Sequence, residues 1–134
     1  MGTEGSRGFS LAALAAAAAC AVGAIAGPVP EGVWGGSQGN LDVYADSAAL
    51  DLPCAAGRIQ QAVVAGADGT FDLSGLYAVE AGPVQADGPA WQPARFEGSR
   101  VGDEIILSIA LSDSVTVGPL RLRRGTVGTF PRCL

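Results

Sequence analysis

The stretch that decides the fold is Ile105-Ile-Leu-Ser-Ile-Ala-Leu-Ser112. Its odd positions, from Ile105 to Leu111, are all aliphatic, whereas serine occupies two of its even positions. Successive side chains of a strand point to opposite faces of a sheet, so this period of two predicts a strand with one buried face. The same alternation recurs at residues 41–45, 50–54 and 71–79.

Less regular segments complete a set of about eight strands. These are residues 33–35, 58–64, 94–101 and 115–122. We expect a bulge at Gln60-Gln61, and a second at Gly118-Pro119, where the apolar parity changes. Consecutive antiparallel strands with mostly short turns close most readily as a barrel. We therefore predict an all-β fold, an antiparallel up-and-down barrel of about eight strands, with a two-sheet β-sandwich as the alternative.

Composition excludes several kinds of site. The 134 residues include 13 acids and 8 bases, and all the bases are arginine, with no histidine or lysine. Without histidine there is no Ser-His-Asp or Cys-His pair and no histidine metal ligand, and without lysine there is no Schiff base. A pI of about 4.4 argues against a nucleic-acid surface. We expect no enzyme, cofactor or metal site.

The N-terminal segment has the features of a secretory signal peptide. An apolar run over residues 9–26 follows Arg7 and ends in Ala24-Ile25-Ala26, a pattern typical of a cleavage site. We expect residues 1–26 to be a signal peptide with a helical core, so that the exported chain begins at Gly27.

Two alternatives to this cleavage remain open. Cys20 follows Ala17-Ala18-Ala19, which resembles a degenerate bacterial lipobox, so Cys20 is a candidate for lipidation. The third reading is an uncleaved anchor. All three place residues 27–134, a single β-barrel domain, outside the cytoplasm. We expect a secreted or periplasmic protein, or alternatively a membrane-anchored lipoprotein.

Two cysteines remain after the predicted cleavage, Cys54 and Cys133. An even number in an oxidising compartment predicts a disulfide. The bridge would close a loop of about 80 residues, which corresponds to roughly 4–5 kcal/mol in the chain-entropy model. It would also hold the C-terminus, which otherwise frays.

The connection at residues 81–94 is longer than a usual hairpin loop and contains three prolines and Trp91. Long ordered loops are often functional, and tryptophan is enriched at binding hot spots. We therefore expect the binding surface at this end of the barrel, with Trp91 as its anchor. The alternative is a rim loop whose tryptophan caps the barrel end. Trp34, inside the first predicted strand, is expected to be a buried end-plug.

Charge is unevenly distributed along the chain. Residues 27–118 hold twelve acids and three arginines, whereas residues 119–134 hold four arginines and no acid. Arg121 and Arg123 share one face of the last predicted strand. They are a candidate stripe for binding an anion or a partner, or alternatively they pair with acids on the adjacent strand.

Gly32-Val33-Trp34 at the start of an eight-strand barrel, with an arginine near its end, resembles the calycin group of lipocalins and avidins. In that group the tryptophan closes one barrel end and a late arginine packs over it. The chain is also similar to a family of uncharacterised secreted bacterial proteins. The matching motifs are Gly32-x-Trp34-Gly35-Gly36, Cys54-Ala55-x-Gly57, Pro93-Ala-Arg-Phe96 and Cys133-Leu134. This second resemblance implies a fold and a compartment but no activity.

These observations favour an exported, non-catalytic binding protein that acts on another protein as an inhibitor or adaptor. The alternative is a carrier of a small apolar ligand, of lipocalin-like type. We expect no contact with nucleic acid, and contact with a membrane only if Cys20 is lipidated or the N-terminal segment is retained.

Overall fold

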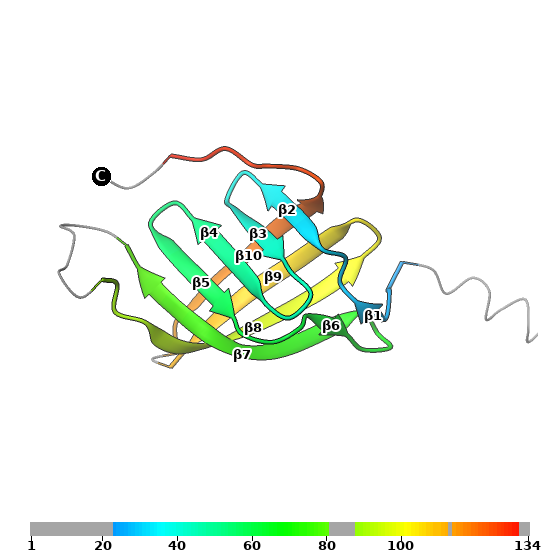
Figure 1. The fold of residues 1–134 in the computed structure, drawn as a ribbon, viewed down its shortest axis with the longest axis horizontal. Coiled ribbons are helices and arrows are strands. Elements are labelled where there is room, and N and C mark those ends of the chain that lie inside the picture. Colours follow the sequence, from blue (N-terminus) through cyan, green and yellow to red (C-terminus); the bar gives the residue numbers. More distant parts are fainter. Residues whose placement is uncertain (1–22, 81–87, 113, 132–134) are drawn as a thin grey trace, which may run out of the picture.

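The chain forms a closed antiparallel β-barrel (Figure 1). This computed structural model describes residues 23–80, 88–112 and 114–131. Eight strands are hydrogen-bonded in the order β10-β2-β3-β4-β5-β7-β8-β9, so each pairs with the next barrel strand in sequence and the last returns to the first. The prediction of an eight-stranded up-and-down barrel is confirmed, and the sandwich alternative is wrong. The apolar core of the predicted signal helix lies outside the described residues.

The strands have the following bounds. They are β1 (Gly27–Pro28), β2 (Gly32–Gly36), β3 (Gly39–Val43), β4 (Ala48–Leu52), β5 (Ala55–Ile59), β6 (Val64–Ala65), β7 (Thr70–Val79), β8 (Gln92–Val101), β9 (Glu104–Leu111) and β10 (Thr116–Arg124). β1 and β6 form a separate two-stranded sheet beside the barrel.

The barrel interior is filled by the alternating apolar side chains. Ile105, Leu107 and Ile109 on β9 have no exposed surface, as the alternation predicts. Burying a large aliphatic side chain contributes roughly 1.5–3 kcal/mol. The largest fully buried side chains are Trp34, Phe96, Leu41, Ile59, Ile105, Leu107, Ile109 and Leu122. Hydrophobic packing inside the barrel is therefore the main stabilising term of the fold.

Glycines inside the strands make room for aromatic rings. A Cβ at Gly98 would overlap the ring of Phe71, and a Cβ at Gly75 or Gly57 would overlap the ring of Phe96. These strand-interior glycines thus have a packing role in addition to permitting the coiling of a small barrel.

One end of the barrel, the closed end, is covered by the N-terminal segment. Val29 and Val63 are both buried there, and the Val29 amide donates to the Val63 carbonyl at 2.9 Å. The prediction of one bulged strand over residues 58–64 is wrong. The barrel strand ends at Ile59, and the chain then continues to β6, which pairs with β1. The short barrel strands do not cover the closed end by themselves, and Val63 is buried there.

Closure depends on a short seam between β10 and β2. Only two residue pairs join these strands, Arg123 with Gly35 and Arg124 with Trp34. On its other side β10 pairs with β9 along most of its length, with a register shift between Val117 and Leu120. This shift confirms the bulge predicted at Gly118-Pro119.

The C-terminal tail, residues 125–131, reinforces the seam. After β10 it turns back across β2 and β3 (the red segment in Figure 1). The Gly125 amide donates to the Val33 carbonyl at 2.8 Å. Asn40 then binds the Gly128 backbone twice: its Nδ2 donates to the Gly128 carbonyl at 3.1 Å, and its Oδ1 accepts the Gly128 amide at 2.7 Å. A Cβ at Gly35 would overlap the tail backbone, so glycine is needed for this close approach.

Asn40→Ala should lower the free energy of unfolding by about 1–3 kcal/mol, because it leaves two half-buried backbone groups without partners. Urea denaturation followed by circular dichroism measures this change. Asp42→Ala, at the next outward position of the same strand, is the control and should change stability by less than about 0.5 kcal/mol. Equal effects of the two substitutions would show that Asn40 does not hold the tail.

Candidate functional site

The barrel end opposite the closed end carries an apolar hollow of about 700 Å³, here named the mouth hollow. It lies at the open end, among the β2–β3 turn, the β4–β5 turn, the end of β7, the start of β10 and the tail. The connection from β7 to β8 begins at this end and stops at Trp91, because residues 92–94 of the predicted loop belong to β8. The structure therefore puts a hollow at the end where we predicted the binding surface.

Buried and exposed apolar side chains line the mouth hollow together. Leu52, Tyr77 and Leu120 belong to the core and are 4–6% exposed. Val79, which is 56% exposed, and the half-buried Val117 are further lining residues. None of the described residues that line the mouth hollow is charged, and their side-chain polar groups come from serine, glutamine, tyrosine and cysteine. This chemistry suits an uncharged, mostly apolar group.

Tyr77, near the end of β7, brings a phenol group to the open end. Burial raises the pKa of Tyr77 above its usual value. A raised pKa for a phenol favours the neutral form, so Tyr77 remains a hydrogen-bond donor throughout the neutral pH range. Sequence reasoning missed Tyr77 because its position in the alternation of β7 indicates only a core residue.

The side chain of Trp91 does not project into solvent at the open end. It is half-buried, and the Arg58 guanidinium carbon lies 4.4 Å from the centroid of its ring, on the outer wall over β5. The same wall has a hollow of about 330 Å³ that includes Asp42 and Pro89. Residues 81–87 lie outside the described part, so the predicted role of the loop stays a prediction, with Trp91 placed on the wall of the barrel.

Trp34 occupies the position expected of an end-plug. It has no exposed surface, and its indole Nε1 donates to the Pro30 carbonyl at 3.1 Å. The arginine over its ring is Arg100 of β8, whose guanidinium carbon is 5.5 Å from the ring centroid. The sequence led us to seek this arginine in the last strand. Arg100 is 7% exposed, and its Nε donates to the Gly102 carbonyl at 3.0 Å.

One of the two arginines of the predicted stripe is paired with an acid. Arg121 binds Glu104 of the adjacent strand at 2.7 Å, and Arg124 lies 3.8 Å from Asp103. Arg123 is exposed, and among the described residues no ion pair is found for it. The alternative of pairing with neighbouring acids therefore describes Arg121. β10 and β5 lie on opposite sides of the eight-strand ring, so the arginines and Trp91 do not form one surface.

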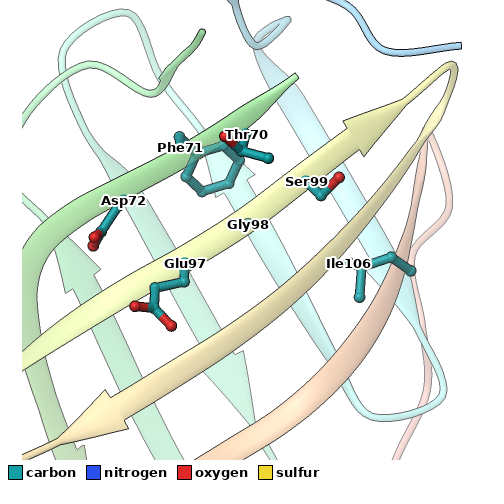
Figure 2. Close-up of a pocket in the computed structure, with 7 residues that line it drawn as sticks. All are labelled: Thr70, Phe71, Asp72, Glu97, Gly98, Ser99 and Ile106. Atoms are coloured by element: carbon teal, nitrogen blue, oxygen red, sulfur yellow. The ribbon is translucent and has the colours of Figure 1, made fainter. Parts of the chain in front are cut away.

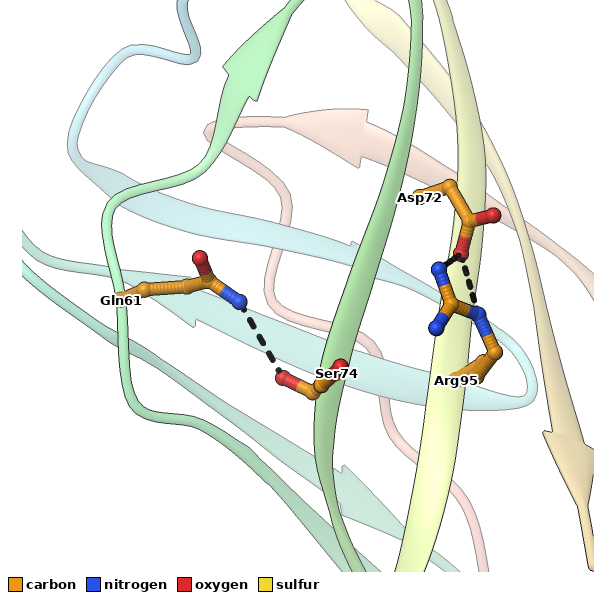
Figure 3. Close-up of polar contacts among 4 residues, drawn as sticks. All are labelled: Gln61, Asp72, Ser74 and Arg95. Carbon is orange, nitrogen blue, oxygen red and sulfur yellow. Dashed lines mark hydrogen bonds and ion pairs between the residues drawn. The ribbon is translucent and has the colours of Figure 1, made fainter.

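A second outer hollow, of about 430 Å³, lies over β7, β8 and β9 (Figure 2). Two acids, Asp72 and Glu97, lie opposite each other in register at its edge. Arg95 partly neutralises them: its Nη2 lies 2.8 Å from Asp72 (Figure 3). Figure 3 also shows Gln61 donating to the Ser74 carbonyl at 3.4 Å. Within the described ranges no group of three or more His, Cys, Asp or Glu residues could hold a metal ion.

The segment around Asp68 forms a turn before β7. The Asp68 carboxylate accepts the Thr70 hydroxyl at 2.7 Å and the Thr70 amide at 3.1 Å. These two bonds, the hydroxyl first, lower the pKa of Asp68. The segment at residues 35–39 has the composition of a loop, since three of its five residues are glycine. Its glycines instead belong to β2 and β3, and only Ser37-Gln38 forms the turn.

We predicted Cys54 inside a strand over residues 50–54, but it lies in the β4–β5 turn, because β4 ends at Leu52. Phe130 and Pro131 line the mouth hollow together with Cys54. Cys133 and the lipidation candidate Cys20 lie outside the described residues, so both assignments remain predictions.

Comparison with known proteins adds no identification. No protein-family model, curated protein or solved structure matches the chain. The described part of the chain also has no helix long and apolar enough to cross a membrane. The site must therefore be interpreted from its own geometry.

Trp34→Ala should lower the free energy of unfolding by about 3–5 kcal/mol, because it empties a fully buried site and leaves Arg100 without its aromatic partner. Trp91→Ala removes only a half-exposed cation–π contact, for which about 0.5–1 kcal/mol is expected. Chemical denaturation of both variants makes the comparison. If Trp91→Ala proves the more damaging, Trp91 is a structural lid rather than a surface residue.

Proposed function

We propose that the protein is an exported, non-catalytic binding protein and that its site is the mouth hollow. The observation that supports this proposal is an uncharged, apolar hollow of about 700 Å³ at the open end. Ligand sites are typically concave, mostly apolar and roughly 300–1,000 Å³ in volume, with a few polar groups that orient the ligand.

The geometry favours a small apolar ligand over a partner protein. A protein-binding surface was expected because Trp91 would be presented by its loop, but Trp91 lies against Arg58 on the outer wall. The barrel interior is packed with fully buried side chains. The ligand would therefore sit in the mouth, above Leu52 and Leu120, rather than deep inside the barrel as in a large lipocalin-like cavity. The resemblance of Gly32-x-Trp34 to the calycin group agrees with this reading.

Export is part of the proposal and rests on the apolar segment within residues 1–26. The alternatives for its processing differ in what they do to the closed end. The Gly23 carbonyl accepts the Gly102 amide at 2.9 Å, and Ala24 forms a bridge with Val101. Cleavage after Ala26 removes these contacts, whereas lipidation at Cys20 or retention of the segment keeps them. The intact mass of the protein from its own host distinguishes the three forms.

The expected Cys54–Cys133 disulfide also belongs to this proposal. Pro131 already lies at the same hollow as Cys54. The chain needs only two further residues, about 7 Å at full extension, to go from Pro131 to position 133.

Changing both Cys54 and Cys133 to serine should lower the free energy of unfolding by about 2–5 kcal/mol. Reducing the wild-type protein should produce the same loss, and it should produce none in the double variant. Thiol labelling of the folded, oxidised protein checks the pairing directly. Labelling of both cysteines under those conditions would disprove the bridge.

Binding at the mouth hollow can be tested with the uncharged apolar dye N-phenyl-1-naphthylamine, whose fluorescence rises in an apolar site. Val79→Glu should weaken dye binding by about tenfold or more, because it places a charge against the ligand. Val64→Glu, a similarly exposed valine at the closed end, is the matched control and should bind as the wild type does.

Unchanged dye binding in the Val79→Glu variant would exclude the mouth hollow as the site. Native mass spectrometry of protein purified from its own host then identifies the class of occupant. A bound small mass supports the carrier, whereas a co-purifying protein supports the inhibitor or adaptor that the sequence also suggested.

A further inference from the structure

Tyr77 is buried in the core but lacks a partner for its hydroxyl. The residue is 6% exposed and belongs to the core cluster. Among the described residues its hydroxyl forms no hydrogen bond. The hydroxyl of a tyrosine packed in an apolar core usually finds a hydrogen-bond partner within the protein. The missing partner needs a physical explanation.

The hydroxyl is open to the mouth hollow. No fully sealed side-chain oxygen or nitrogen in the described residues lacks a partner, so the unpaired Tyr77 oxygen retains access to solvent. Tyr77 lines the mouth hollow, which is the open space at its end of the barrel. Its hydroxyl is therefore a donor among apolar walls.

We propose that the ligand of the mouth hollow is an uncharged apolar molecule with a carbonyl-type acceptor, which accepts a hydrogen bond from the Tyr77 hydroxyl. This inference rests on the function proposed above and specifies the chemistry of its ligand. A free carboxylate is disfavoured, because none of the described residues that line the hollow carries a positive charge to balance it. Ketones, esters and amides present the acceptor without that cost.

The phenol suits this role over a wide pH range. Because burial raises the pKa of Tyr77, the group stays protonated and remains a donor at neutral pH. A single well-placed polar group in an apolar site mainly determines orientation and specificity. Tyr77 would thus act as a positioning group that fixes which end of the ligand enters the hollow.

A matched pair of ligands tests the proposal: 2-acetylnaphthalene, which has a carbonyl, and 2-ethylnaphthalene, which does not. Each is titrated against protein loaded with N-phenyl-1-naphthylamine, and dye displacement gives its affinity. The wild type should bind the acetyl compound about three- to tenfold more tightly, the range expected from one net hydrogen bond. Tyr77→Phe should abolish this preference and leave the affinity for 2-ethylnaphthalene unchanged.

Tyr44→Phe is the control, since Tyr44 is 52% exposed and does not line the hollow; it should keep the preference. Equal binding of the two compounds to the wild type would overturn the inference, as would a preference that survives in the Tyr77→Phe variant. In both cases the mouth hollow still binds apolar molecules and the proposed function stands. If the dye and both compounds fail to bind the wild type, the proposed function fails, and this inference fails with it.

Discussion

The short seam between β10 and β2 is the constraint on which the barrel depends. An eight-strand sheet of this kind buries one face only when its two edges meet, and here they meet through two residue pairs. Fewer residue pairs join β10 to β2 than join β9 to β10 or β9 to β8, so closure needs a further contribution. The tail supplies it by running across the outside of β2, where Gly35 leaves room for its backbone.

This arrangement links the stability of the seam to the shape of the mouth hollow. The tail residues that follow Gly128 are the ones that reach the open end, where Phe130 and Pro131 form part of the wall. Asn40 fixes the point from which those residues extend. A disturbance of the seam therefore also changes the wall of the mouth hollow, although Asn40 itself is not among the residues that line this hollow.

The fold was largely predictable because its signal is local. Alternation along β9, the buried Trp34 and the change of parity at Gly118-Pro119 each follow from a few neighbouring residues. The errors concern contacts between distant segments. An apolar residue at position 63 fits a barrel strand as well as the position observed. Val63 instead leaves the barrel wall and bonds with Val29, because the barrel strands do not cover the closed end by themselves.

For the site proposed here, the sequence indicated only the end of the barrel. The long connection after β7 indicated that end. A tryptophan on a loop can either project into solvent or pack against an arginine on the outer surface of the barrel, and Trp91 packs against Arg58. Arg100 was missed because a lone arginine late in an alternating strand gives no sign of burial. Tyr77 was missed for the opposite reason: its burial was foreseeable, but the absence of a hydroxyl partner depends on every neighbouring element.

The entry point of the chain has a topographical consequence. Gly23 is held at the turn between β8 and β9, which lies at the closed end, and the mouth hollow lies at the far pole of the barrel. The segment upstream of Gly23 therefore joins the barrel at its closed end. In a form that keeps this segment, the chain would be attached at the closed end, and the proposed site would lie at the opposite end of the barrel.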